Sequence, residues 1–325
     1  DGVNLDEEAT GIRMSLEDMK AKLWRMNTQA KFMLEEGSKY KGYADPKAKP
    51  FMGYEIVDYL LVYDDFKQGM IVPWKPEEQV YRPDYFDVLK RVGGEYYVNE
   101  LGVDEVWLWG WHHGKIEPAE SNMSSPTTKD VSNSERTDDL PVYNSTYVLY
   151  NYSMSRDATE AVHNHGHQIE AVMMYANEQT DDTRDLFLKD FVGWKWEGED
   201  ERHRQAPIGR CGDTHHPANT TQDYDYYNET LAESDIMDWK PDGSGKKTLV
   251  NCHTWGDIPY AWPDGISPVN NDPRARAEAH WYIFWMQNIP GYKNDIDYNG
   301  KKLTNWFEYI ADWDNAVRSG YKMYR

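Results

Sequence analysis

Three histidines and a glutamate fall within eight positions of the stretch HNHGHQIE, residues 163–170, in a chain that has ten histidines in total. In a helix, spacings of three, four and three residues place side chains on one face, which gives the row Glu160, His163, His167 and Glu170. Two histidines one turn apart reach the same divalent ion, and a carboxylate one turn further on completes a three-ligand set with an open coordination position. We therefore predict a catalytic metal site on His163, His167 and Glu170.

Two other interpretations of this stretch stay open. The histidine spacing matches that of the His-Glu-x-x-His zinc proteases, but Asn164 stands where those enzymes carry the catalytic glutamate, so the match to this motif is incomplete. The first alternative is that the row forms a polar helix face on which the histidines hydrogen-bond to neighbouring carboxylates. Gly166 would also cost a helix about 1 kcal/mol relative to alanine, and a break there would scramble the spacing.

Further ligands are predicted from segments outside this helix. The stretch CGDTHHPANTTQDYDYYN, residues 211–228, carries His215 and His216 on irregular backbone, where loops often hold functional side chains. It also carries Asp225, a candidate acid or base, and His253 follows later in the chain. We expect His215, His216 or His253 to complete the site. Zinc suits such ligands best, and copper, iron, manganese and calcium are the alternatives.

The two cysteines bear on the same region. An even pair in a secreted chain predicts one disulfide, between Cys211 and Cys252. Such a bond would bring His215 or His216 close to His253. Two free thiols are the alternative.

A second cluster belongs to the tryptophan-rich stretch VWLWGWHHGKIE, residues 106–117. Alternate residues of a strand share a face, so one face would carry Trp107, Trp109 and Trp111. Indole rings stack on sugars, and a carboxylate pair provides the acid and the nucleophile or base of a glycosidase. We predict substrate binding by Trp109, Trp111, His112 and His113, with Glu120 as an acid or base. Simple core packing of at least two of the tryptophans is the alternative.

The hydrophobic pattern predicts the elements that must carry these residues. Helices are expected over residues 15–37, 83–94, 158–177, 274–288 and 304–318, and strands over residues 53–66, 103–114, 146–153 and 249–255. The strand, helix and strand of residues 53–114 predict a parallel pair with a right-handed crossover. The polar, aperiodic residues 117–140 predict a long loop at a strand end, where α/β sheets bind ligands.

We therefore expect an α/β fold with a mixed or parallel sheet, flanking helices and long irregular loops. A helical N-terminal segment, residues 1–50, would pack on a single large domain, residues 51–325.

Composition excludes several classes of partner. A net charge of −21 opposes binding to nucleic acid, whose phosphates are held by clustered lysine and arginine. No run of 18 apolar residues occurs, so no membrane partner is expected.

Five N-glycosylation sequons, where about two are expected by chance, predict a secreted glycoprotein. Their asparagines are Asn122, Asn144, Asn151, Asn219 and Asn228.

Several strings resemble those of a family of large secreted proteins of bacteria and other organisms. They are ESNM, GHQIEAVMMY, CGDTHHPANTTQDYDYYN, ESDIMDW, YIFWMQNIPG and TNWFEYIADWD. The resemblance covers most of the chain after Gly53 and implies an extracellular location and one continuous domain. It carries no reaction with it, and it supports residues 107–255 forming one site.

These observations predict a secreted metal-dependent hydrolase that acts on a glycan, another extended extracellular substrate or a small molecule. The alternatives are a metal-independent glycoside hydrolase with paired carboxylates, a carbohydrate-binding protein with a structural ion, and a copper or iron oxidase. Sequence motifs of nucleotide-dependent and thiol-dependent catalysis are absent.

Overall fold

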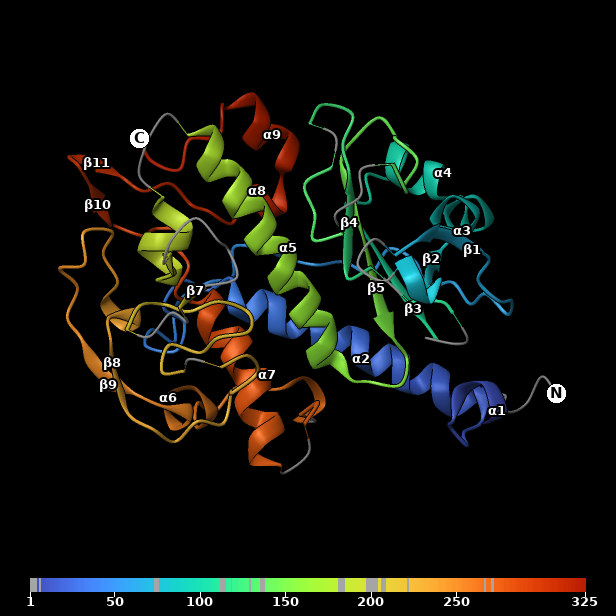
Figure 1. The fold of residues 1–325 in the computed structure, drawn as a ribbon, viewed down its shortest axis with the longest axis horizontal. Coiled ribbons are helices and arrows are strands. Elements are labelled where there is room, and N and C mark those ends of the chain that lie inside the picture. Colours follow the sequence, from blue (N-terminus) through green and yellow to red (C-terminus); the bar gives the residue numbers. More distant parts are fainter. Residues whose placement is uncertain are drawn as a thin grey trace. The chain divides into compact units, whose positions relative to one another are not determined.

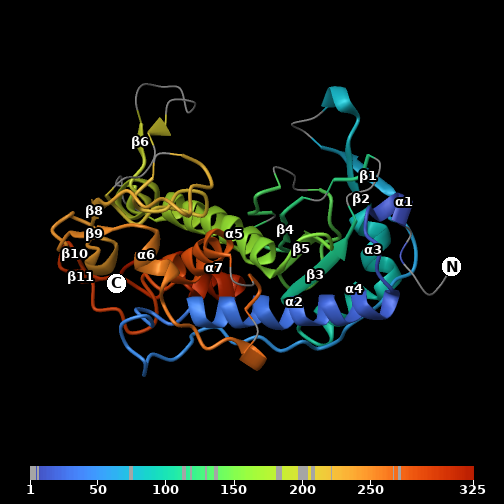
Figure 2. The ribbon, with the colours of Figure 1, turned by 90° about the horizontal axis from the view of Figure 1, so that it is seen from below.

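The computed structural model describes residues 5, 7–72, 76–111, 115–117, 119–128, 130–134, 138–180, 185–196, 204–205, 209–220, 222–265, 267–269 and 272–325. The chain divides into two compact units. The first unit consists of Asp1–Thr28 and Glu55–Ala171, and the second of Gln29–Tyr54 and Val172–Arg325. Two long helices, α2 (Leu16–Gly37) and α5 (Ala158–Gln179), contribute residues to both units (Figures 1 and 2). The predicted boundary near residue 50 stays a prediction.

A three-stranded mixed sheet forms the centre of the first unit. Its order is β3 (Glu105–Gly110), β5 (Tyr147–Ser153) and β4 (Ser121–Ser124). β3 runs parallel to β5, with Glu105 opposite Val148, and β4 runs antiparallel to β5. Helices flank this sheet, so the predicted α/β class with a mixed sheet is confirmed.

Side chains alternate between the two faces of this sheet. On one face, Leu149 of β5 packs with Leu89 of α3 (Tyr85–Val92) and Val98 of α4 (Gly94–Asn99). On the other face, Tyr150 of β5 stacks on His165 of α5, with ring centroids 3.7 Å apart. The sheet is thus held between α3 and α4 on one side and α5 on the other.

The predicted strand over residues 53–66 is wrong. This segment follows an irregular path without strand pairing, and several of its apolar side chains are exposed, Val57 by 53% and Tyr63 by 67%. Its acidic residues bind nearby polar groups instead: Asp58 accepts from the Tyr97 hydroxyl, and Asp64 pairs with Arg91. The parallel pair of the sheet is therefore β3 with β5.

The rest of the first unit comprises α1 (Glu7–Thr10), β1 (Gln68–Ile71), the 3₁₀ turn η1 (Pro76–Glu78) and β2 (Tyr81–Pro83).

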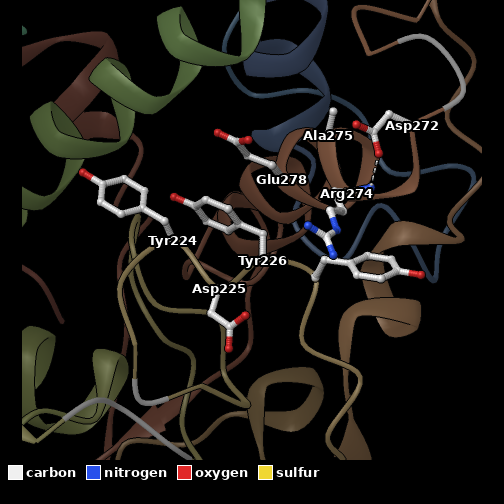
Figure 3. Close-up of a pocket in the computed structure, with 8 residues that line it drawn as sticks. Tyr224, Asp225, Tyr226, Asp272, Arg274, Ala275 and Glu278 are labelled. Carbon is white, nitrogen blue, oxygen red and sulfur yellow. Dashed lines mark hydrogen bonds between the residues drawn. The ribbon is translucent and has the colours of Figure 1, made fainter.

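The second unit surrounds α7 (Pro273–Met286), whose last turns are buried on all sides. The indole N–H groups of Trp281 and Trp285 donate to the carbonyls of Asp213 and Gly212, both at 3.0 Å, which anchors the loop that contains His215. Gly212 has φ +73°, and a Cβ there would lie 2.2 Å from the His216 carbonyl oxygen, so only glycine fits. The first turns of α7 face the loop of residues 224–227 (Figure 3).

Short elements complete the second unit. Its helical pieces are the π-helical η2 (Leu186–Val192), the 3₁₀ turns η4 (Ile236–Asp238) and η5 (Pro263–Gly265), and α6 (Cys252–Gly256), α8 (Glu308–Ala311) and α9 (Trp313–Arg318). Three antiparallel pairs join β6 (Lys195–Trp196) to β7 (Arg204–Gln205), β8 (Ala232–Ser234) to β9 (Thr248–Val250), and β10 (Asp297–Tyr298) to β11 (Lys301–Lys302).

Caps shorten two predicted elements of this unit. The predicted strand 249–255 ends at Val250, because Asn251 forms a capping box that starts α6. The predicted helix 304–318 divides at Asp312, whose side chain accepts from the Asn315 N–H and caps α9. In the first unit, β4 lies within the predicted loop 117–140.

The predicted disulfide is wrong, because Cys211 and Cys252 are both free and buried. The Cys211 N–H binds the Phe191 carbonyl, whereas Cys252 is the first residue of α6 and binds the Asn228 carbonyl. Burial raises the pKa of both thiols. The covalent link that was to bring His215 or His216 close to His253 is therefore absent.

Burial also removes three of the five predicted glycosylation sites. Asn122, Asn151 and Asn219 are at most 4% exposed, and each side-chain amide donates a hydrogen bond inside the protein. Asn144 and Asn228 remain, which is about the number expected by chance. The sequon excess thus no longer supports secretion.

Among the described residues, no helix combines the length and apolar character needed to cross a membrane.

Candidate metal centre

Helix α5 forms as predicted and continues through Gly166. Its apolar face is buried to at least 98%, at Ala161, Val162, Ile169, Val172 and Met173. That burial offsets the low helix propensity of glycine, because most helix stability in proteins comes from packing. The polar row that begins at Glu160 therefore keeps its one-face spacing.

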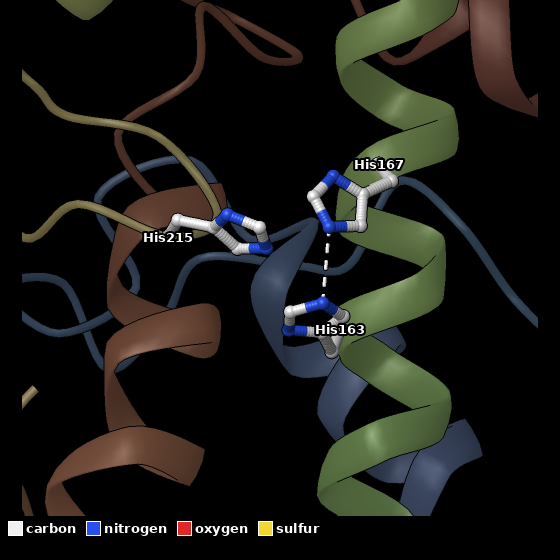
Figure 4. Close-up of side chains that lie close together, drawn as sticks. All are labelled: His163, His167 and His215. Atoms are coloured by element: carbon white, nitrogen blue, oxygen red, sulfur yellow. Dashed lines mark hydrogen bonds between the residues drawn. The ribbon is translucent and has the colours of Figure 1, made fainter. Parts of the chain in front are cut away.

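His163 and His167 lie one turn apart with their rings nearly perpendicular and their centroids 4.6 Å apart (Figure 4). Their Nε2 atoms are 3.0 Å apart, and each side chain is 11% exposed. A zinc ion binds histidine nitrogen at about 2.0–2.1 Å, so one ion fits against both nitrogens. The third histidine drawn in Figure 4, His215, belongs to the second unit.

Glu120, just before β4, brings a carboxylate to these two histidines. Its Oε1 lies 4.0 Å from the His163 Nε2, and its Oε2 lies 3.7 Å from the His167 Nε2. The Asn133 side-chain amide donates to the same carboxylate. The side chain is 39% exposed, so it can move the remaining few tenths of an ångström toward a bound ion. The sequence singled out Glu120 as an acid or base, and the structure places it among the histidines.

Two amide side chains on α5 fix the backbone that carries Glu120. Asn164 donates to the Glu120 carbonyl at 3.5 Å and to the Asn151 carbonyl at 3.2 Å. Gln168, one turn later, accepts from the Ser121 hydroxyl at 2.7 Å. Both amides are buried. They hold α5 against β4 and β5, and so they hold the Glu120 carboxylate opposite the histidines.

Glu170 takes a different place from the one predicted. Its Oε2 lies 3.0 Å from the Nδ1 atom of His167, across the ring from the nitrogen that faces His163. Metal-bound histidines commonly donate this second N–H to a carboxylate, which fixes the ring and raises its basicity. Glu170 therefore orients His167 from outside the candidate ligand set.

Glu160 is a buried carboxyl at the start of the row. Its side chain is 13% exposed, and Arg156 approaches it at 3.5 Å. In the part of the chain that the structure describes, its Oε2 has no hydrogen-bond partner. Burial raises the pKa of Glu160 to about 7, and the nearby negative charge of Glu120 adds to the rise. The group can therefore take up or release a proton near neutral pH.

This raised pKa predicts a pH-dependent gain in stability for Glu160→Gln. Between the ordinary pKa of 4.5 and the folded value of about 7, the folded state binds more protons than the unfolded state, so wild-type stability falls as pH rises. Glutamine does not titrate, so the variant does not lose this stability as pH rises. Urea unfolding of the metal-free proteins should show a gain near zero below pH 4.5 that grows to about 3 kcal/mol above pH 7. Glu178→Gln, an exposed change on the same helix, is the control. A gain that does not vary with pH would contradict this assignment.

His165 lies on the opposite face, as the helical spacing predicts. It is 1% exposed, its Nε2 lies 3.1 Å from the Glu105 Oε2, and its ring stacks on Tyr150. It belongs to the core between α5 and the sheet.

The tryptophan cluster is mostly a packing feature. Trp109 is 8% exposed, its indole N–H donates to Asn27 at 2.7 Å, and its ring packs on Tyr152. Trp107 donates to Glu105 at 2.7 Å. Trp111 is half-buried, and its predicted contact with substrate stays a prediction. The other two predicted substrate residues, His112 and His113, lie outside the described residues.

The remaining predicted residues belong to the second unit. His216 lies between two carboxylates, with Nδ1 2.9 Å from Asp213 and Nε2 2.9 Å from Asp223. His215 lies 3.6 Å from Asp223. His253 is 50% exposed and pairs with Asp257 and Glu229, and Asp225 lines a pocket. That His215, His216 or His253 supplies a further ligand stays a prediction.

Comparison with known proteins gives no match: no family model, no curated protein and no solved structure is significantly similar to this chain.

Proposed function

We propose that the first unit is a metal-dependent hydrolase whose single divalent ion, zinc in the first instance, is bound by His163, His167 and Glu120. The observation that carries this proposal is the pair of Nε2 atoms 3.0 Å apart with a carboxylate within 4.0 Å of both. The carboxylate of Glu170 on the far nitrogen of His167 supports it, because metal-bound histidines commonly have such a partner.

Two histidines and one carboxylate leave a position for water in a four-coordinate site. A catalytic zinc lowers the pKa of its bound water to about 7 and so supplies hydroxide at neutral pH. Glu160, with its raised pKa, would accept the proton of that water or give one to the leaving group. The proposed substrate is a glycan or another extended molecule outside the cell, as the sequence predicts.

One observation favours a second candidate, glycoside hydrolysis without a metal. Burial raises the pKa of Glu160 to about 7, and the negative charges of Asp157 and Glu120 add to the rise. A carboxyl that stays protonated near neutral pH beside another carboxylate is the arrangement of a glycosidase acid and its nucleophile or base. Glu160 would then be the acid and Glu120 the second group.

Chelation separates the two candidates. The purified chain would be tested for turnover of nitrophenyl esters, phosphates and glycosides, before and after removal of metal, with melting temperature recorded in parallel. The proposal expects turnover to be lost on chelation and restored by zinc or manganese, while the fold persists. Glycoside turnover that survives chelation would replace it with the two-carboxylate mechanism. A large fall in melting temperature without any turnover would indicate a structural ion.

Glu170→Gln tests the orienting role of this carboxylate. Glutamine keeps the size of the side chain but loses the charge that stabilises the His167 N–H. We expect zinc affinity to fall about 10–100-fold, the usual effect of losing an outer carboxylate. Competition with a chromogenic chelator measures it, and Glu178→Gln on the same helix is the matched control. Complete loss of zinc binding would instead indicate that Glu170 is a direct ligand. Unchanged affinity would show that Glu170 does not orient His167 for metal binding.

A further inference from the structure

The second unit contains a pocket that the metal centre does not use. Its volume is about 490 Å³, which is within the usual size range of small-molecule sites. One wall is the loop of residues 224–227, and the other is the first two turns of α7, which carry Arg274 and Glu278 (Figure 3).

Both walls are held in place by internal hydrogen bonds. Asp225 accepts from the Asn228 amide at 2.8 Å and from the Thr220 hydroxyl at 3.3 Å through one oxygen, Oδ2. On the opposite wall, Asp272 caps α7 by accepting from the Arg274 N–H at 2.9 Å. The polar groups of the pocket are thus positioned before any ligand arrives, which lowers the entropic cost of binding.

Tyrosines supply the aromatic surface of this pocket. Tyr224 is 56% exposed and has φ +61°, an uncommon conformation for a bulky residue. Tyr226 is buried and hydrogen-bonds to Tyr282 at 2.8 Å. The Tyr282 hydroxyl in turn lies 3.4 Å from the Glu278 carboxylate. An exposed ring therefore stands beside a row of hydroxyl and carboxylate groups.

We infer that this pocket binds a neutral saccharide of one or two residues. Sugars present CH faces that stack on aromatic rings, and hydroxyl groups that both donate and accept hydrogen bonds. Glu278 accepts from such hydroxyls, and Arg274 donates to them. With Asp272, the pocket holds three carboxylates to one arginine, which opposes phosphate or carboxylate ligands. None of the residues that line the pocket is one of the three proposed metal ligands, although Tyr224 packs on His215, with ring centroids 4.3 Å apart.

The test uses the full chain and a panel of cellobiose, xylobiose, chitobiose, maltose, mannobiose and lactose. Saturation-transfer NMR detects binding, and calorimetry measures Kd. We expect at least one disaccharide to bind with a millimolar or lower Kd. Tyr224→Asn, which tolerates the left-handed backbone but removes the ring, and Glu278→Gln should each weaken binding by about 10-fold. Tyr292→Ala, an exposed tyrosine outside the pocket, is the matched control and should leave Kd unchanged.

Three results would overturn the inference. The first is that no disaccharide binds at tens of millimolar. The second is that binding is indifferent to both pocket substitutions, which would place the sugar elsewhere. The third is that spermidine binds in the pocket and excludes the sugars, which would make it a site for organic cations. Circular dichroism spectra that match the wild type are required of each variant, and Glu278→Gln, a change of nearly equal size, provides a second test if Tyr224→Asn does not fold.

Discussion

Replacing His167 with alanine is expected to abolish metal binding by the first unit. The variant loses the Nε2 atom that lies 3.0 Å from the His163 Nε2, and it leaves Glu170 without the ring that it orients. Zinc-binding free energies of about 10–16 kcal/mol, shared among three or four ligands, correspond to about 2.5–5 kcal/mol per ligand, or about 100- to several-thousand-fold in affinity. Turnover should fall at least as far, because no activated water remains.

The measurement is metal content after dialysis against buffer containing a weak chelator. His253→Ala is the control, because that side chain is exposed and pairs with Asp257 and Glu229. In the same assay, His215→Ala and His216→Ala test the prediction that the second unit adds a ligand. Stoichiometric metal in His167→Ala would exclude the proposed site on α5.

Asp139→Ala is expected to give the largest loss of stability in the first unit. Arg82 is fully buried, and its guanidinium lies 2.6 Å from the 4% exposed carboxylate of Asp139. The same carboxylate accepts from Asn122 at 2.9 Å. Removing one partner of a buried pair leaves an uncompensated charge in a low-dielectric interior, which costs about 3–5 kcal/mol. The Arg82 guanidinium also donates to the Ser134 carbonyl, next to the asparagine that binds Glu120, so metal affinity should weaken as well.

Urea unfolding measures this loss, and the neighbouring exposed residue supplies the control, Asp138→Ala. Asp138→Ala should change the free energy of unfolding by less than about 0.5 kcal/mol. A loss below about 1 kcal/mol for Asp139→Ala would mean that Arg82 finds another partner or reaches water.

Local patterns in the sequence predicted the helices that carry the site. The row of Glu160, His163 and His167 spans only about two helical turns, and the apolar residues between them show which face is buried. The bounds of α3 were equally predictable from the sequence, because Asp84 caps its start and Gly93, with φ +72°, ends it. Such signals lie within a few residues of one another and do not depend on the rest of the chain.

Features that depend on contacts far apart in the sequence were not predictable. Glu120 meets α5 because β4 pairs with β5, and the sequence indicated a loop there. Residues 53–66 have the composition of a strand but pair with no strand. Cys211 and Cys252 looked like a bonded pair, although each is buried as a free thiol.

One signal for the contact of Glu120 with α5 was present in the sequence. Asn164 and Gln168 are four residues apart on α5, beside the histidine row, and both are buried amides bonded to the segment around Glu120. Two amide side chains one turn apart beside an ionisable row indicate a face that hydrogen-bonds to a neighbouring segment. Their partners became known only from the structure.

One metal ion is expected to bind to His163, His167 and Glu120. Plasma mass spectrometry of the undenatured chain, incubated with zinc, copper, iron or manganese and then dialysed, measures this binding. We expect about one equivalent of metal per chain in the wild type and a large loss in His167→Ala. Wild-type protein that retains none of these ions would contradict it, and the row on α5 would then be a polar helix face.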